Sequence, residues 1–263
     1  MKFVIKTMDR VDGLKTMTYK FLKEHGVKDD DIYIFVSTEK DHDEYQKAFP
    51  DCLVIKGPLG IVPIDNFIVD FFEEGVKYIY LNDDIKRLYY APDRRKLQVV
   101  PNFNPLIEKT FLMMEEQGIT YAGLNPVDNP YFMRGQSEFK YGLSIITDPF
   151  SFVINNKSIK LTQFYIDENY NDNSFSDYEK SILHFKDKGK ILRLNWYSAD
   201  VLYFNGAETS NRTKENCGIT AKLMMEKYPE YITSIKNNKN GFKSLRLKRI
   251  KVEKNKFDCA LPV

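Results

Sequence analysis

The chain of 263 residues is long enough for one large domain or two small ones with a full hydrophobic core. Its 43% hydrophobic and 29% charged residues are ordinary for a globular protein, and a net charge of +2 excludes strong attraction of the whole molecule to nucleic acid. Any contact with DNA or RNA must therefore come from a local patch. One candidate patch is a basic cluster near the C-terminus: Arg246, Lys248, Arg249, Lys251, Lys254 and Lys256.

The first third of the chain predicts an alternation of strands and helices. Apolar and β-branched runs predict strands at residues 3–5, 31–36, 53–55 and 77–81. Apolar residues at helical spacing predict helices at residues 14–25, 41–48 and 64–74. This alternation is typical of a parallel sheet, whose right-handed crossovers bring the carboxyl ends of the strands to one edge. We therefore expect Thr7, Ser37, Gly57 and Asp83 to line one crevice at that edge.

The regularity falls after residue 100, so the second half predicts a mixed arrangement. Helices are predicted at residues 104–117, 177–188 and 216–228, with Asn216 as the cap of the last one. Strands are predicted at residues 121–124, 143–146, 151–154 and 191–194 and in the alternating segment 242–252. With no internal repeat and no long linker, a single domain is the simplest interpretation.

Three scattered cysteines form neither a disulfide framework nor a CxxC metal site, which is typical of a reducing cytosol. No apolar stretch approaches the ~20 residues of a membrane-spanning helix, and the first apolar run is too short for a signal peptide. We therefore expect a cytoplasmic protein without a membrane span. The sequence leaves its oligomeric state open.

The most informative segment is the strand at residues 77–81 followed by Asn82, Asp83 and Asp84. Adjacent carboxylates repel each other, and the cost grows where water is scarce. A surface turn or a helix cap is the simple alternative, because Asp favours both. The buried strand before the pair and Ile85 after it favour a bound divalent cation, Mg²⁺ or Mn²⁺, held by Asp83 and Asp84.

The strand-terminal Asn82-Asp83-Asp84, fourth in the series, resembles the DxD motif of GT-A fold nucleotide-sugar glycosyltransferases. The chain is most similar to the TET-associated glycosyltransferases of phages, and the resemblance covers most of its length. It rests on short segments at residues 43–45, 53–55, 60–61, 66–72, 81–85, 122–124, 129–132, 176–178 and 189–195. Two positions depart from the family pattern: Asn82 stands where an Asp is common, and Asp65 where an Arg is common.

The resemblance implies an α/β, GT-A-like single domain over residues 1–263, with a mostly parallel central sheet flanked by helices. Residues 1–100 would form the nucleotide-binding half and residues 101–263 the acceptor-binding half. The implied activity is metal-dependent transfer of a sugar from a nucleotide sugar, a UDP-sugar first, to a hydroxyl group. The implied acceptor is a modified base of the 5-hydroxymethylcytosine type in phage DNA, which would place the protein in the host cytoplasm.

The resemblance also implies roles for individual residues. Asp177 begins a late helix where GT-A enzymes carry an acid that faces the acceptor, and we expect it to be the catalytic base, although a helix cap explains the same residue. Thr7 and Arg10 follow the first strand and are expected to contact the nucleotide. The same expectation holds for Ser37, Asn82 and Asp83, with solvated loops as the alternative for Thr7, Arg10 and Ser37.

Three other functions remain open on sequence alone. The first is a GT-A glycosyltransferase that acts on a polysaccharide, lipid or protein. The second is a nucleotidyltransferase, which also holds Mg²⁺ on an Asp pair but normally carries a Gly-rich basic loop that residues 7–13 match poorly. The third is a nucleotide-binding module without catalysis. No histidine follows His184, so the third metal ligand that many GT-A enzymes take from a C-terminal histidine is missing or replaced.

Overall fold

The structure is a computed structural model that describes residues 1–167, 170–202 and 213–250. Its helices are α1 (Val11–Leu14), a π-helical turn (Lys15–Tyr19), α2 (Lys20–Glu24), a 3-10 turn (Asp29–Asp31), α3 (Glu39–Ala48), α4 (Ile61–Phe71), α5 (Asn104–Glu116), α6 (Pro130–Met133), α7 (Ser176–Lys188) and α8 (Lys214–Lys227). The α1, π-helical and α2 segments follow one another directly, so residues 11–24 form one continuous helical run.

The strands fall into one large sheet and three small ones. The large sheet contains β1 (Lys2–Lys6), β2 (Ile32–Val36), β3 (Leu53–Lys56), β4 (Lys77–Leu81), β7 (Tyr121–Leu124), β8 (Phe139–Tyr141), β9 (Phe150–Ile154) and β12 (Leu192–Leu194). The small sheets pair β5 (Ile85–Tyr90) with β6 (Gln98–Val99) and β13 (Tyr197–Val201), β10 (Phe164–Asp167) with β11 (Tyr170–Asp172), and β14 (Ile232–Asn237) with β15 (Lys243–Leu247).

The large sheet has the order β3-β2-β1-β4-β9-β7-β12-β8. Strands β3, β2, β1 and β4 are parallel neighbours, and β7 pairs with β12 in parallel. Strand β9 runs antiparallel to both β4 and β7, so β4 and β7 point the same way. The carboxyl ends of β1, β2, β3, β4 and β7 therefore lie at one edge, as the sequence predicts for the first four. In open α/β sheets this edge is where ligands bind.

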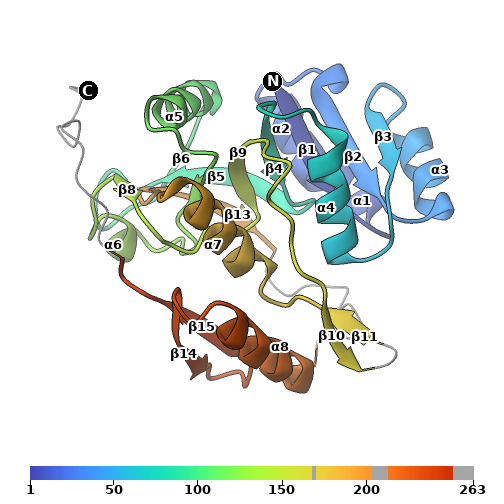
Figure 1. The fold of residues 1–263 in the computed structure, drawn as a ribbon. Coiled ribbons are helices and arrows are strands. Elements are labelled where there is room, and N and C mark those ends of the chain that lie inside the picture. The colour runs from blue at the N-terminus through green and yellow to red at the C-terminus, as the bar shows by residue number, and fades with distance from the viewer. Residues whose placement is uncertain (168–169, 203–212, 251–263) are drawn as a thin grey trace.

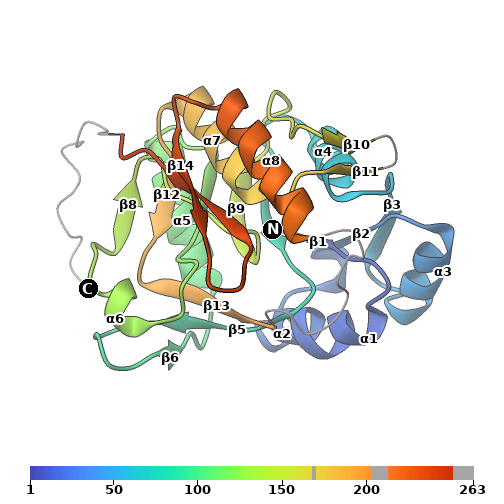
Figure 2. The same ribbon diagram turned by 90° about the horizontal axis from the view of Figure 1, so that it is seen from below.

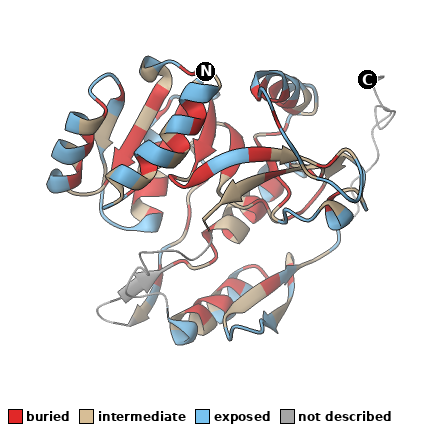
Figure 3. Cartoon of the chain, turned by 180° about the vertical axis from the view of Figure 1, so that it is seen from behind, coloured by how far each residue is buried: buried red, intermediate tan, exposed pale blue. Residues whose placement is uncertain are grey.

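Helices cover both faces of this sheet, giving three layers (Figures 1 and 2). One core cluster joins residues 11–24, α3, α5 and β5 to the first face, and Leu14, Tyr45 and Phe111 are among its buried members. A second cluster joins α4, α7 and α8 to the other face through residues such as Ile68 and Ile182. Buried residues accordingly concentrate in the sheet and on the inner sides of the helices (Figure 3). The expected α/β fold, with a mostly parallel central sheet flanked by helices, is confirmed.

Several local predictions are wrong for physical reasons. Residues 143–146 form no strand, because the Ile146 N–H donates to Ser181 Oγ of α7 at 3.1 Å instead of to a neighbouring strand. Helix α8 begins earlier than predicted and is capped by Thr213, whose Oγ1 accepts from the Asn216 N–H. The antiparallel sheet of β5, β6 and β13 was not foreseen, and its pairing of β5 with β13 joins segments more than 100 residues apart. None of the helices in the described ranges is both long and apolar enough to cross a membrane.

Candidate active site

The turn after β4 places Asp83 and Asp84 at the ligand-binding edge. Residues 82–84 join β4 to β5, and the hydroxyl of Thr18 fixes this turn from the helical run beside it. Thr18 Oγ1 donates to the Asn82 carbonyl at 2.7 Å and accepts from the Ile85 N–H at 2.8 Å. Because both ends of the turn are held, the two carboxylates are presented by rigid backbone between buried strands.

Both carboxylate oxygens of Asp83 have partners. Thr7 Oγ1, directly after β1, donates to Oδ2 at 2.6 Å, and Arg10 Nη1 lies 2.9 Å from Oδ1. Burial raises the pKa of Asp83, while the Thr7 hydrogen bond and the Arg10 charge oppose that rise. Of the residues expected to line one crevice, Thr7 thus contacts Asp83 directly, and Arg10 joins them.

Tyr45 on α3 completes this arrangement; the sequence placed it in a segment that resembles the family but gave it no role at the site. Its hydroxyl accepts from the Arg10 N–H at 3.0 Å and lies 2.8 Å from Thr7 Oγ1. Because the Thr7 proton is given to Asp83, Tyr45 must donate to Thr7. Burial raises the pKa of Tyr45 to about 12, so it keeps the proton that this chain of hydrogen bonds requires.

Asp84 differs from Asp83 because one of its oxygens is unused. The side chain is 8% exposed, and Oδ1 is buried without a hydrogen-bond partner. Burial raises the pKa of Asp84, and the neighbouring negative charge of Asp83 raises it further. A buried, unpartnered carboxylate oxygen is costly and is a ready ligand for a hard cation.

The carboxylate pair fits a divalent cation with few protein ligands. The described residues contain no cluster of three or more His, Cys, Asp or Glu side chains that could hold a metal ion by themselves. Mg²⁺ characteristically keeps several waters and binds through one or two carboxylates together with substrate phosphates. Asp84 Oδ1 is the free protein ligand here, whereas Asp83 is already engaged by Thr7 and Arg10.

An open pocket of about 370 Å³ lies beside Arg10. Its lining residues come from the segment after β1 and from α3: Asp9, Arg10, Val11, Asp12, Gly13, Lys40 and Glu44. Asp9 adopts a positive φ of 51°, and its N–H donates to Asp41 Oδ1 at 3.1 Å, which ties this segment to α3. The loop that carries Arg10 is thus held in a defined conformation next to the Asp pair.

A second charged cluster lies on the opposite face of the sheet at the same edge. Lys6 Nζ lies 2.8 Å from Asp65 Oδ1, and the Tyr80 hydroxyl donates to the same oxygen at 2.7 Å. Burial alone would raise the pKa of Asp65, but the charges of Lys6 and Lys180 lower it. Asp65 is therefore ionised, with Lys6 in contact and the charge of Lys180 near it.

Asp177 belongs to this second cluster, which lies at the same edge of the sheet as the Asp83–Asp84 pair but on the opposite face. A hydrogen bond joins its side chain to that of Asp148, and Lys180 Nζ lies 2.9 Å from Asp148 Oδ1. Burial and the Asp148 charge together raise the pKa of Asp177 to about 7. The Asn82 N–H donates to the Pro149 carbonyl at 3.3 Å. Asp148 therefore directly precedes a residue that contacts the turn of the Asp pair.

The other sequence-predicted residues occupy plainer positions. Ser37 Oγ donates to the Pro58 carbonyl at 3.1 Å and has no contact with the Asp pair. Asn82 uses its backbone in the turn, and its side chain is half-buried. His184 stacks on Tyr121 and lies 2.9 Å from Thr120 Oγ1, and burial lowers its pKa to about 3, so it is a neutral packing residue.

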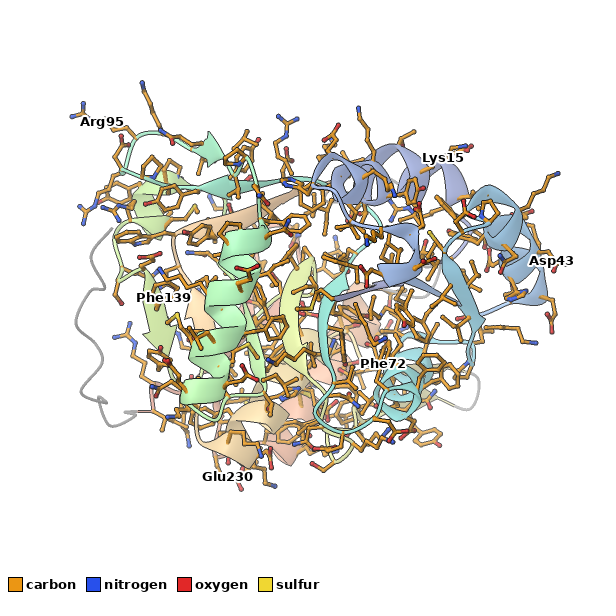
Figure 4. The ribbon with its side chains drawn as sticks, turned by 90° about the horizontal axis from the view of Figure 1, so that it is seen from above. Lys15, Asp43, Phe72, Arg95, Phe139 and Glu230 are labelled. Carbon is orange, nitrogen blue, oxygen red and sulfur yellow. The ribbon has the colours of Figure 1, made fainter. Side chains whose placement is uncertain are left out.

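An aromatic and basic patch surrounds α6, which follows the carboxyl end of β7. Tyr131 and Phe132 are 61% and 58% exposed, which is unusual for side chains of this size. Arg134 lies 3.3 Å from the centre of the Trp196 ring, and Arg94 lies 5.8 Å from that of Tyr131. The neighbouring Arg95 projects outward at the end of the β5–β6 connection (Figure 4).

The basic cluster near the C-terminus is only partly described. Arg246 on β15 and Arg249 are exposed, and Lys248 is half-buried. Lys251, Lys254 and Lys256 lie outside the described residues, so their expected contact with DNA is not tested. The α6 patch therefore offers the better-defined basic surface.

Comparison with known proteins connects these features to a family. The model of the TET-Associated Glycosyltransferase family matches residues 1–201. No curated protein matches the chain.

Two of the solved structures that resemble the chain are named here, and each shares 13% sequence identity or less with it. TarS of S. aureus, residues 1–349 in complex with UDP-GlcNAc, has a TM-score of 0.48 over 86% of this chain and 67% of that one, at 13% identity. A mannosyltransferase of Pyrobaculum calidifontis in complex with GDP-Man and Mn²⁺ has a TM-score of 0.37 over 58% of this chain and 44% of that one, at 9% identity.

Proposed function

The chain belongs to the TET-associated glycosyltransferase family, and on that premise we propose that it transfers a sugar from a nucleotide diphosphate sugar to a hydroxyl group with the help of Mn²⁺ or Mg²⁺. The observation that carries the metal requirement is the buried, unpartnered Oδ1 of Asp84 at the ligand-binding edge of the sheet. Arg10 stands beside the pair as a second positive charge for a diphosphate. A UDP-sugar is the first donor to test, since TarS was solved with UDP-GlcNAc.

In this proposal Asp84 holds the cation, and Asp83 orients Arg10 and Thr7. The bound cation would neutralise charge on the departing diphosphate. The Thr7–Tyr45 hydrogen bonds keep Asp83 in one orientation, so Arg10 is positioned before the donor arrives. Positioned groups of this kind lower the barrier without having to reorganise during the reaction.

Asp177 is the proposed general base. The oxygen of the acceptor hydroxyl forms a bond to the anomeric carbon, its proton passes to the Asp177 carboxylate, and the bond from that carbon to the diphosphate oxygen breaks with its electron pair. A pKa of about 7 suits this task, because a base works best when its pKa is near the working pH. Asp177 is the second residue of α7, and the N-cap position is Phe175 with no side-chain capping hydrogen bond, so the simple capping alternative lacks support.

We further propose DNA with hydroxylated bases as the acceptor, bound over the α6 patch. Exposed aromatic rings stack on unpaired bases, and arginine side chains contact phosphates. Tyr131, Phe132, Arg94 and Arg134 supply this combination at the same edge of the sheet as the Asp pair. A neutral polysaccharide acceptor would use the rings but not the arginines.

The donor site is tested by thermal unfolding with a panel of nucleotide sugars, each with and without Mn²⁺. We expect one of them to raise the melting temperature only with metal, and Asp84→Asn to abolish that rise. Asp43→Asn is the matched control, because Asp43 points outward from α3 (Figure 4). If no nucleotide sugar stabilises the wild type in the presence of metal, the non-catalytic alternative is favoured instead.

The acceptor is tested by retention on single-stranded DNA at increasing salt. We expect Tyr131→Ala with Phe132→Ala to weaken retention by more than tenfold, since each stacked base contributes about 1–3 kcal/mol and the double variant removes two rings. Tyr165→Ala, which removes a 78% exposed ring from β10 on a different part of the surface, is the control. Equal retention of all variants, or transfer to a polysaccharide but not to DNA, would contradict the DNA acceptor.

A further inference from the structure

Five charged side chains from four parts of the fold meet in the cluster that contains Asp177. They are Lys6 at the end of β1, Asp65 on α4, Asp148 before β9, and Asp177 and Lys180 on α7. Lys180 and Asp148 are 12% and 13% exposed, and Asp65 is 4% exposed. The charges therefore lie where water screens them little.

The charges of this cluster do not balance when all five groups are ionised. Three carboxylates face two ammonium groups, which leaves one net negative charge in a largely buried place. One additional proton makes the cluster neutral, and a buried unbalanced charge is costly. The cluster is thus built to retain one proton.

The contacts decide which group holds that proton. Asp65 is bound by Lys6 and by the Tyr80 hydroxyl, and Asp148 is bound by Lys180. Asp177 has no lysine in contact, and its described partners are Asp148 and a long 3.5 Å contact from Ser176 Oγ. Asp177 is therefore the carboxyl that gains most from being protonated.

The groups around the pair do not offer an alternative proton holder. Tyr80 from β4 and Tyr121 from β7 have pKa values raised by burial, so both stay neutral. His184 on α7 stays neutral because burial lowers its pKa. Burial lowers the pKa of Lys180, but the charges of Asp148 and Asp65 outweigh it and raise that pKa well above its ordinary value.

We propose that Asp148 is a positioning residue that shares one proton with Asp177, with Lys180 fixing the negative charge on Asp148. This inference rests on the proposed role of Asp177 as the base. In the free enzyme the shared proton is bound to Asp177, whose carboxyl group donates a hydrogen bond to the Asp148 carboxylate. This proton must leave to solvent before Asp177 accepts the proton of the acceptor hydroxyl. Sugar transfer is consequently switched on as the pH rises through neutrality, and not near pH 4 as for an ordinary Asp.

Two variants that change the charges around Asp177 should shift the acid limb of the pH–rate profile in opposite directions. Asp148→Asn removes the negative charge next to Asp177, so the acid limb of the rate profile moves down by at least one pH unit. Lys180→Met removes a positive charge, so the acid limb moves up. Asp187→Asn is the matched control, since Asp187 lies on the same helix but bonds to Asn156 and Lys188 outside the cluster. Circular dichroism confirms that each variant is folded.

A measurement without catalysis separates this inference from the proposed function. Carboxyl ¹³C shifts of aspartate-labelled protein are followed against pH, and the Asp177 signal is assigned by its loss in Asp177→Asn. Titration of Asp177 near pH 7, falling by at least one unit in Asp148→Asn, supports proton sharing even when no sugar is transferred. Titration near pH 4 in the wild type, or the same midpoint in both proteins, overturns it whatever the activity. If Asp177 titrates near pH 7 as expected but the rate of sugar transfer does not change around that pH, the role of Asp177 as the base is contradicted instead.

Discussion

Lys6 and Thr7 are neighbours at the end of β1, yet their side chains contact carboxylates on opposite faces of the sheet. Lys6 Nζ lies 2.8 Å from Asp65 Oδ1, while Thr7 Oγ1 donates to Asp83 Oδ2 at 2.6 Å. Alternation along a strand makes this possible, because successive side chains point to opposite faces. One strand end thus connects the metal-binding candidates to the cluster around Asp177.

Thr7→Val tests the hydrogen bonds that orient Asp83. Valine keeps the shape but removes the hydroxyl, so Asp83 Oδ2 and the Tyr45 hydroxyl each lose a buried partner. We expect the free energy of unfolding to fall by about 1–3 kcal/mol, measured by urea denaturation at pH 7. Thr16→Val is the control, because Thr16 is exposed and its hydroxyl bonds only to nearby backbone carbonyls. An equal loss in both variants would show that the Thr7 hydroxyl adds nothing specific.

Arg10→Met tests the charge next to the Asp pair. The guanidinium binds Asp83 and is the nearest fixed cation to the proposed diphosphate position. We expect the dissociation constant of the stabilising nucleotide sugar to rise by roughly tenfold or more, because charge-assisted hydrogen bonds contribute about 1.5–3 kcal/mol. Lys15→Met, on the outward side of the neighbouring helical turn (Figure 4), should leave the affinity measured by calorimetry unchanged. Unchanged affinity in Arg10→Met would remove Arg10 from the donor site.

Asp177→Asn tests the linkage between this carboxyl and stability. The pKa of Asp177 rises from its ordinary value of 3.8 to about 7 on folding, so the folded chain binds this proton more tightly than the unfolded chain. The Asp177 contribution to the free energy of unfolding therefore falls as the pH rises from about 4 to 7. We expect Asp177→Asn to be more stable than the wild type by roughly 1–3 kcal/mol at pH 8, with a smaller difference at pH 4. Thermal unfolding at both pH values measures this, and a variant less stable at pH 8 would contradict it.

Gly123→Ala tests how closely residues 143–146 pack against β7. A Cβ at Gly123 would lie 2.2 Å from Ile146 Cγ2, so the two cannot coexist without movement. We expect the free energy of unfolding to fall by about 1–3 kcal/mol. The double variant with Ile146→Ala should lose less stability than the sum of the two single changes. Gly218→Ala in α8 is the control. Its Cβ would meet only Lys243 Cε at 3.8 Å, so it should be neutral or stabilising by up to about 1 kcal/mol.

The sequence by itself determined strands β1 to β4, the helices between them and the Asp pair that follows β4. Its apolar runs and helical spacings are local signals, and they match β1 to β4, α3, α5 and α7 to within a few residues. Parallel α/β topology then brings the strand ends together without further information, so the meeting of Thr7 with Asp83 was predictable. Gly26 and Gly189 end helices with positive φ values, as turn chemistry predicts.

Only the tertiary structure decided which polar side chains surround these residues. The sequence assigned no role to Tyr45, Asp148 or Lys180. Each becomes informative only through contact with residues 30 or more positions away, or through an unbalanced charge in a buried place. The tertiary structure also placed Asp83 and Asp177 in clusters on opposite faces of the sheet at the same edge. The reason is physical: burial and charge balance are sums over neighbours in space, and the order of residues along the chain does not contain them.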